Sequence, residues 1–235
     1  MTQLTHLTTE QSKQRKDTIM DKKFHTLAVQ IAFNAMPASY KEKFLTDFSF
    51  DLLLEAADIP YEGDTFGENQ SLHRGHCLKL YLKGRDLHKI GDSNILEELS
   101  LYSAGVNEAS KQGNDLVVRY NIAKGCHFIV DLATYCHVNE STWDKYHTKF
   151  EDLSSVWIEY HQGLVAELVQ RYKPDPMRSV PNRCRKIADD AFFASMDYLP
   201  ALKRNGQITD LQWAGMTVQH CYNLMDWFST FEKFL

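Results

Sequence analysis

The chain has 235 residues, 43% apolar and 24% charged, which is enough for one globular domain with a full hydrophobic core. Its 31 acidic and 26 basic side chains give a formal charge of -5, which argues against a nucleic-acid-binding protein because such proteins usually present a basic surface. Five cysteines without a CxxC spacing argue against a disulfide framework and favour a reducing compartment.

The first 22 residues are polar and predict an N-terminal arm, so we place the folded domain at residues 23–235. No apolar segment follows the basic residues of this arm, which argues against a secretory signal. A cytoplasmic location is the default expectation, and secretion by another route stays open. No apolar run reaches the length of a membrane span.

Helical periodicity continues from Phe24 to the C-terminus. In chain order, helices are expected from 24 to the stop at Pro37, then at 40–57, from 71 to a loop at 84–92, and at 94–111, 115–135, 142–172, 182–204 and 209–234. We find neither the alternation typical of β-strands nor internal repeats. The sequence therefore predicts one all-α domain.

One histidine and one aspartate lie four residues apart in the segment 125–137. On a helix, His127 and Asp131 share a face, and their nitrogen and oxygen donors suit a divalent metal ion. The apolar residues around them indicate a central helix, where such a pair is costly to bury without a compensating partner. Because His137 follows Asp131 by six residues, we expect the helix to end or bend near Tyr135.

A second pair with the same spacing, His147 and Glu151, lies on the next predicted helix. A single pair of this kind is usually an ordinary hydrogen bond, and a metal site is the minority outcome. Two pairs within 25 residues, with a third histidine between them, are much less expected by chance. Together they predict a metal site in the core of a helical protein.

This ligand order resembles that of the bacterial zinc-dependent phospholipase C family, which shares its fold with the fungal single-strand-specific nucleases. The residues that match the family pattern are His127, Asp131, His137, His147 and Glu151. Upstream, Asp58 followed by His73 is similar to an earlier ligand pair of the family, and residues 25–32, which begin with His25, resemble its N-terminal helix. The resemblance runs from about residue 24 to the C-terminus and implies a single-domain, all-α, multi-helix bundle.

The resemblance implies a cluster of two to three zinc ions. One ion would be held by Asp58, His73, His127 and Asp131, a second by His137, His147 and Glu151, and a third by His25, with Asp131 bridging to the first. It also implies a phosphodiester hydrolase in which metal-bound hydroxide attacks phosphorus. Asp58 would be the catalytic residue that accepts the proton of the water.

Two ligand positions stay open. The family completes its third ion with an N-terminal tryptophan, but the first tryptophan here is Trp143. Asp21, four residues before His25, is a candidate replacement on the same helical face, and its alternative role is a charge at a helix N-terminus. His76 competes with His73, and the family spacing favours His73.

Arg74 and Phe66 are candidate substrate-binding residues. Arg74 stands where the nucleases carry a base-stacking residue, and Ile59 stands where choline-selective phospholipases carry an aromatic residue. An arginine can pair with a phosphate, although it is more often a solvated charge. These differences favour a phospholipid whose head group is not choline over a nucleic acid, with peripheral contact to a membrane.

Three alternatives remain beside this hypothesis. A nuclease of the same fold would use the same metal chemistry, whereas a non-catalytic helical binding module would use the metal for folding alone. The second proposed ion has three protein ligands and hence an open coordination position, which favours catalysis. A di-iron bundle is disfavoured because the helices that carry the candidate ligands lack a Glu-x-x-His motif. The oligomeric state is not predicted.

Overall fold

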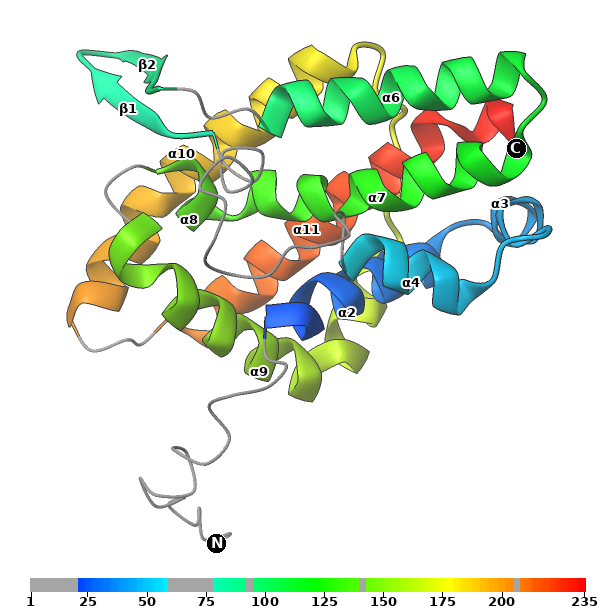
Figure 1. The fold of residues 1–235 in the computed structure, drawn as a ribbon. Coiled ribbons are helices and arrows are strands. Elements are labelled where there is room, and N and C mark those ends of the chain that lie inside the picture. The colour runs from blue at the N-terminus through cyan, green and yellow to red at the C-terminus, as the bar shows by residue number, and fades with distance from the viewer. Residues whose placement is uncertain (1–20, 59–77, 92–94, 140–142, 205–207) are drawn as a thin grey trace, which may run out of the picture.

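The computed structural model describes residues 21–58, 78–91, 95–139, 143–204 and 208–235, without the side chains of 21–23, 143–148, 151, 199 and 201–204. Its elements are α2 (Asp21–Ala35), α3 (Ala38–Phe44), α4 (Phe50–Asp58), β1 (Leu80–Lys83), β2 (Asp86–Lys89), α6 (Ile95–Lys111), α7 (Asp115–Ala133), α8 (Tyr135–Val138), α9 (Trp143–Val169), α10 (Val180–Arg204), α11 (Asp210–Thr230) and the 3-10 helix η1 (Glu232–Phe234). The predicted all-α class is confirmed (Figure 1).

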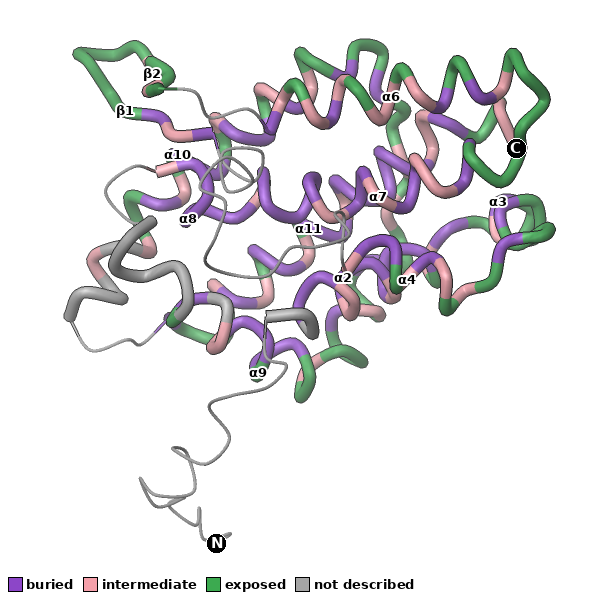
Figure 2. Tube along the Cα trace, viewed as in Figure 1, coloured by how far each residue is buried: buried purple, intermediate pink, exposed green. Residues whose placement is uncertain are grey.

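Helices α7 and α11 pack against each other in the middle of the molecule, and each of them has eleven buried residues (Figures 1 and 2). Their contact is close because Gly125 has no side chain and the indole of Trp227 occupies the space that a Cβ would need. The Trp227 Nε1–H donates to the carbonyl of Ile122 at 2.9 Å. A glycine and a fully buried tryptophan therefore fix the spacing of the two central helices.

The other helices cover this central pair on two sides. Helices α6 and α10 pack against α7, while α2 packs against α11, α9 and α4. The N-terminus of α11 is held by a capping box between Thr209 and Gln212, and Asn114 caps α7. None of the helices in the described part of the chain has both the length and the apolar composition of a membrane span.

The single helix expected at 40–57 is wrong, because two helices occupy this region. The chain turns between α3 and α4 at Asp47, whose φ of 58° lies in the left-handed region. The buried guanidinium of Arg119 on α7 donates to the carbonyls of Lys43 and Phe44, each 2.8 to 2.9 Å away. These donors satisfy carbonyls at the end of α3, so a distant side chain stabilises a break that local periodicity does not indicate.

Two further expectations are wrong for the described residues. The sequence predicts no strands, and it predicts a helix from residue 71 up to the loop at 84. From Leu80 to Lys89 the chain forms an antiparallel hairpin, with Leu80 opposite Lys89 and Lys83 opposite Asp86. Gly84 turns the chain with a φ of 67°. Only four residues belong to each strand, which is too short for an alternating pattern to stand out in the sequence.

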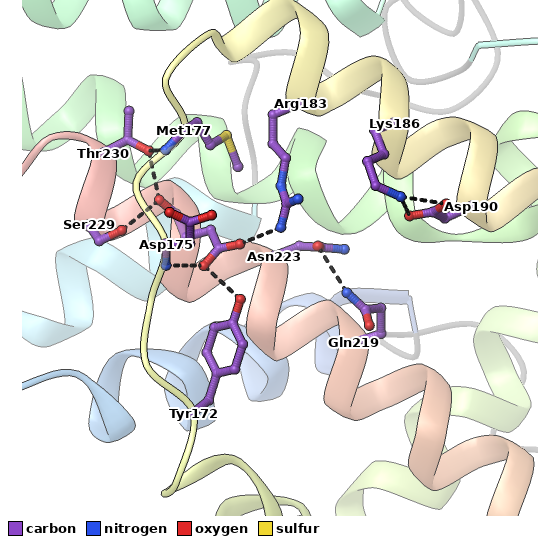
Figure 3. Close-up of polar contacts among 11 residues, drawn as sticks. Tyr172, Asp175, Met177, Arg183, Lys186, Asp190, Gln219, Asn223, Ser229 and Thr230 are labelled. Atoms are coloured by element: carbon purple, nitrogen blue, oxygen red, sulfur yellow. Dashed lines mark hydrogen bonds and ion pairs between the residues drawn. The ribbon is translucent and has the colours of Figure 1, made fainter.

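The proline-rich stretch between α9 and α10 is fixed to α11 by a buried carboxylate (Figure 3). Asp226 accepts hydrogen bonds from Tyr172 Oη at 2.9 Å, from the backbone N–H of Asp175 at 2.7 Å and from Arg183 Nη2 at 2.7 Å. Its charge is compensated by Arg183, as burial of a carboxylate requires. These contacts connect the segment before α10, and α10 itself through Arg183, to α11.

The close contact of α7 with α11 makes a first prediction. Gly125→Ala should lower the free energy of unfolding by roughly 1–3 kcal/mol or more, because the new methyl group overlaps Trp227. The matched control is Gly163→Ala on α9, where a Cβ would meet no atom within 4 Å. That substitution should raise the free energy of unfolding by about 0.5–1 kcal/mol through helix propensity. If both substitutions changed the free energy of unfolding equally in urea denaturation, α7 and α11 would be able to move apart to make room for the new methyl group without loss of stability.

Candidate metal centre

Two imidazoles face one buried carboxylate where α2 meets α7. His25 Nε2 lies 2.8 Å from Asp131 Oδ1, and His127 Nε2 lies 3.2 Å from Asp131 Oδ2. The two rings stack with centroids 4.4 Å apart and planes 13° from parallel. Each histidine therefore presents a ring nitrogen to a different oxygen of the same carboxylate.

These three side chains meet the geometric requirement for a metal site. One ligand atom from each of His25, His127 and Asp131 lies within 4.8 Å of the others, and Asp131 is fully enclosed by protein. The spacing of four residues between His127 and Asp131 puts both on one face of α7, as the sequence predicts. Helix α2 supplies His25 from 106 residues away in the chain.

The contacts of the two ring nitrogens of His127 show whether the site is suited to a cation. Its Nδ1 lies 3.0 Å from the carbonyl oxygen of Ala57 at the end of α4, and this contact requires the proton on Nδ1. In the neutral ring Nε2 then carries a lone pair, which faces a carboxylate oxygen. Two electron-rich atoms at this distance repel unless a proton or a metal ion lies with them. A histidine held by a carbonyl through one nitrogen is also the usual arrangement of a metal ligand, so the residues fit.

The electrostatics of the site favour an ionised carboxylate. Burial alone would raise the pKa of Asp131, but the positive charges of His137 and His127 in their protonated forms, with the hydrogen bonds that protonated His127 and His25 donate, lower it more. The net effect holds the pKa of Asp131 well below its usual range. Asp131 therefore offers a buried negative charge to a cation at neutral pH.

The predicted bend after Asp131 is confirmed. Helix α7 ends at Ala133, Thr134 is extended with φ of -91° and ψ of 120°, and α8 begins at the next residue. The turn brings His137 Nε2 to 3.6 Å from Asp131 Oδ1. A second short helix thus adds a third imidazole beside the carboxylate.

A buried histidine on α11 supports this bend. His220 Nδ1 lies 2.7 Å from the carbonyl of Met216, and His220 Nε2 lies 3.0 Å from Thr134 Oγ1. Burial lowers the pKa of His220 to about 4, so the ring is neutral at physiological pH. No local sequence pattern indicates this role of His220, since Thr134 lies 86 residues away in the chain.

Asp58, the predicted catalytic residue, is the last residue of α4 and directly follows the carbonyl that contacts His127. It is half-buried and does not belong to the group of three ligand atoms described above. Its roles as ligand and as proton acceptor stay predictions.

The remaining predicted site residues cannot be placed. His73, His76, Arg74 and Phe66 lie outside the described residues. Asp21 starts α2, and His147 and Glu151 lie in the first turns of α9, but their side chains are outside the description too. The second ion, the candidate substrate contacts and the bridging role of Asp131 therefore remain predictions.

Comparison with known proteins gives a relationship at the level of the fold. No protein-family model matches the chain, and no curated protein matches its sequence. Among solved structures, alpha-toxin from an avian strain of Clostridium perfringens is similar, with a TM-score of 0.55 and 12% sequence identity. The match covers 93% of this chain and 64% of the toxin chain, so this chain spans less than two thirds of the toxin's length. The similarity shows a shared fold.

The geometry predicts that zinc binding depends on Asp131. Asp131→Asn keeps the size of the side chain but removes its charge, so zinc affinity in a chelator-competition titration should fall at least about 100-fold. Asp189→Asn is the matched control, because Asp189 forms an ion pair with Arg185 on the same helix, α10, and does not belong to the candidate centre. An Asp131→Asn protein that binds zinc as tightly as the control would contradict the assignment.

Proposed function

We propose that this protein is a zinc-dependent phosphodiester hydrolase of the phospholipase C type. The observation that carries the proposal is the cluster of His25, His127 and Asp131, with His127 oriented by the Ala57 carbonyl. The ligand order in the sequence and the shared fold with the clostridial alpha-toxin support it. The substrate we favour is a phospholipid whose head group is not choline.

The described residues would hold zinc between α2 and α7, with His137 beside them. We further propose that His73, His147, Glu151 and Asp58 complete a cluster of two to three ions. Bound zinc would supply Lewis acidity, which polarises a phosphoryl oxygen and lowers the pKa of a water molecule.

The protein's own groups have separate tasks in this proposal. Asp131 supplies the buried negative charge that binds the cation, and its full enclosure keeps that attraction strong because little water screens it. The Ala57 carbonyl holds the His127 ring so that Nε2 faces the site. We assign to Asp58 the role of accepting the proton of the attacking water. No covalent bond between enzyme and phosphorus is needed.

The proposal predicts phosphodiester hydrolysis that needs the metal. Zinc-loaded protein should hydrolyse an anionic phospholipid faster than phosphatidylcholine or single-stranded DNA, and a chelator should abolish the activity until zinc is restored. Fastest cleavage of single-stranded DNA would favour a nuclease. A zinc-loaded protein without activity on any of these substrates would contradict the proposal and leave a metal-stabilised binding module.

The roles of two acidic residues can be separated in the same assay. Asp131→Asn should reduce kcat/KM by at least about 100-fold, and Glu151→Gln should reduce it less. The reason is that we assign Asp131 to two ions and Glu151 to one. A larger loss for Glu151→Gln would show that the bridging assignment is wrong.

A further inference from the structure

The β1–β2 hairpin carries a concentration of positive charge that is opposite to the charge of the chain. Residues 79–89 contain Lys79, Lys83, Arg85 and Lys89 against Asp86, so four positive charges and one negative charge give +3. With the whole chain at -5, the remaining residues sum to -8. The hairpin is therefore a local basic surface on an acidic protein.

Apolar side chains are exposed beside these charges. Tyr81 and Leu82 are 39% and 41% exposed, and of the two strands only Leu80 is buried. The hairpin projects from the helical body, and its surface is exposed on nearly all sides (Figures 1 and 2). Exposed tyrosine and leucine beside lysine and arginine are the side chains that bind an anionic membrane interface.

The base of the hairpin is attached to the candidate metal centre. The backbone N–H of Leu78 donates to the carbonyl of His137 at 2.9 Å, and Leu80 forms a parallel bridge with Asn139. On the other side, Arg185 Nη2 on α10 donates to the carbonyl of Leu87 at 3.4 Å. A two-stranded hairpin is only marginally stable alone, so these contacts hold it in a fixed direction next to His137.

We propose that the β1–β2 hairpin is a docking surface for an anionic phospholipid membrane, which presents the lipid to the neighbouring metal centre. This inference rests on the proposed function, since it supplies that site with its substrate. Lys83 and Arg85 at the turn attract the negative surface, and Tyr81 and Leu82 enter the head-group region. A nucleic acid would be attracted by the same charges and could stack a base on Tyr81, but the rest of the chain carries a charge of -8, which repels a polyanion, and the exposed Leu82 suits a lipid interface better than a base.

The test is sedimentation of the 235-residue chain with lipid vesicles in the absence of added metal, which measures binding without hydrolysis. Wild type should bind vesicles of phosphatidylcholine mixed with phosphatidylserine, bind pure phosphatidylcholine weakly, and lose binding as salt rises. The double variant Lys83→Gln/Arg85→Gln should bind the anionic vesicles about 25-fold more weakly, from roughly fivefold per basic residue. Tyr81→Ser/Leu82→Ser should weaken binding to both vesicle types.

Matched controls lie elsewhere on the surface. Lys111→Gln/Lys186→Gln removes the same charge from exposed positions on α6 and α10, and Leu211→Ser removes a leucine that is 83% exposed. Both controls should bind like wild type, and circular dichroism should show every variant folded. The proposal would be overturned if the wild-type protein did not bind anionic vesicles, or if the hairpin variants bound them as tightly as the controls do.

Tighter binding to single-stranded DNA than to anionic vesicles, lost in the Lys83→Gln/Arg85→Gln variant, would also overturn it and assign the hairpin to a nucleic acid. Failure of the proposed function can be distinguished from failure of the docking surface, because a protein without hydrolytic activity can still sediment with vesicles. Conversely, hydrolysis of soluble phosphodiesters without binding to vesicles would support the proposed function and contradict the docking surface.

Discussion

The carboxylate of Asp131 is the constraint on which the arrangement of this protein depends. A charged group without access to water must be compensated, and here His25, His127 and His137 provide the compensation from three different helices. Because each helix contributes one or more of these groups, the polar centre determines how α2, α7 and α8 meet. The same charge that makes the centre costly to bury makes it suitable for a cation.

The packing around the centre leaves its histidines little freedom. The indole of Trp227 against Gly125 fixes α7 on α11 only two residues before His127. The Ala57 carbonyl fixes the ring of His127, and His220 contacts Thr134 at the bend that directs His137 inward. A metal site that is formed before the metal arrives needs this kind of support, since each ligand would otherwise have to be ordered on binding.

The sequence predicted the parts of the fold that depend on local pattern. The spacing of His127 and Asp131 and the bend near Tyr135 follow from helical geometry, and both are confirmed. The break between α3 and α4 depends on Arg119, which lies 75 residues after Phe44 in the chain. The local sequence therefore gives no indication of this break. The sequence pattern does not predict the hairpin, because four residues per strand are too few to show an alternating periodicity. Its basic charge does not appear in the overall composition either, since the whole chain is acidic.

X-ray absorption at the zinc edge of the zinc-loaded protein tests the central claim most directly. The four cysteines in the described residues are buried, and none lies in the candidate centre. Zinc held by His25, His127 and Asp131 should have nitrogen and oxygen neighbours at about 2.0–2.2 Å, with scattering from more than one imidazole and no sulfur. Sulfur ligands at about 2.3 Å, or a zinc ion surrounded by water without imidazole, would contradict the assignment of the centre to His25, His127 and Asp131.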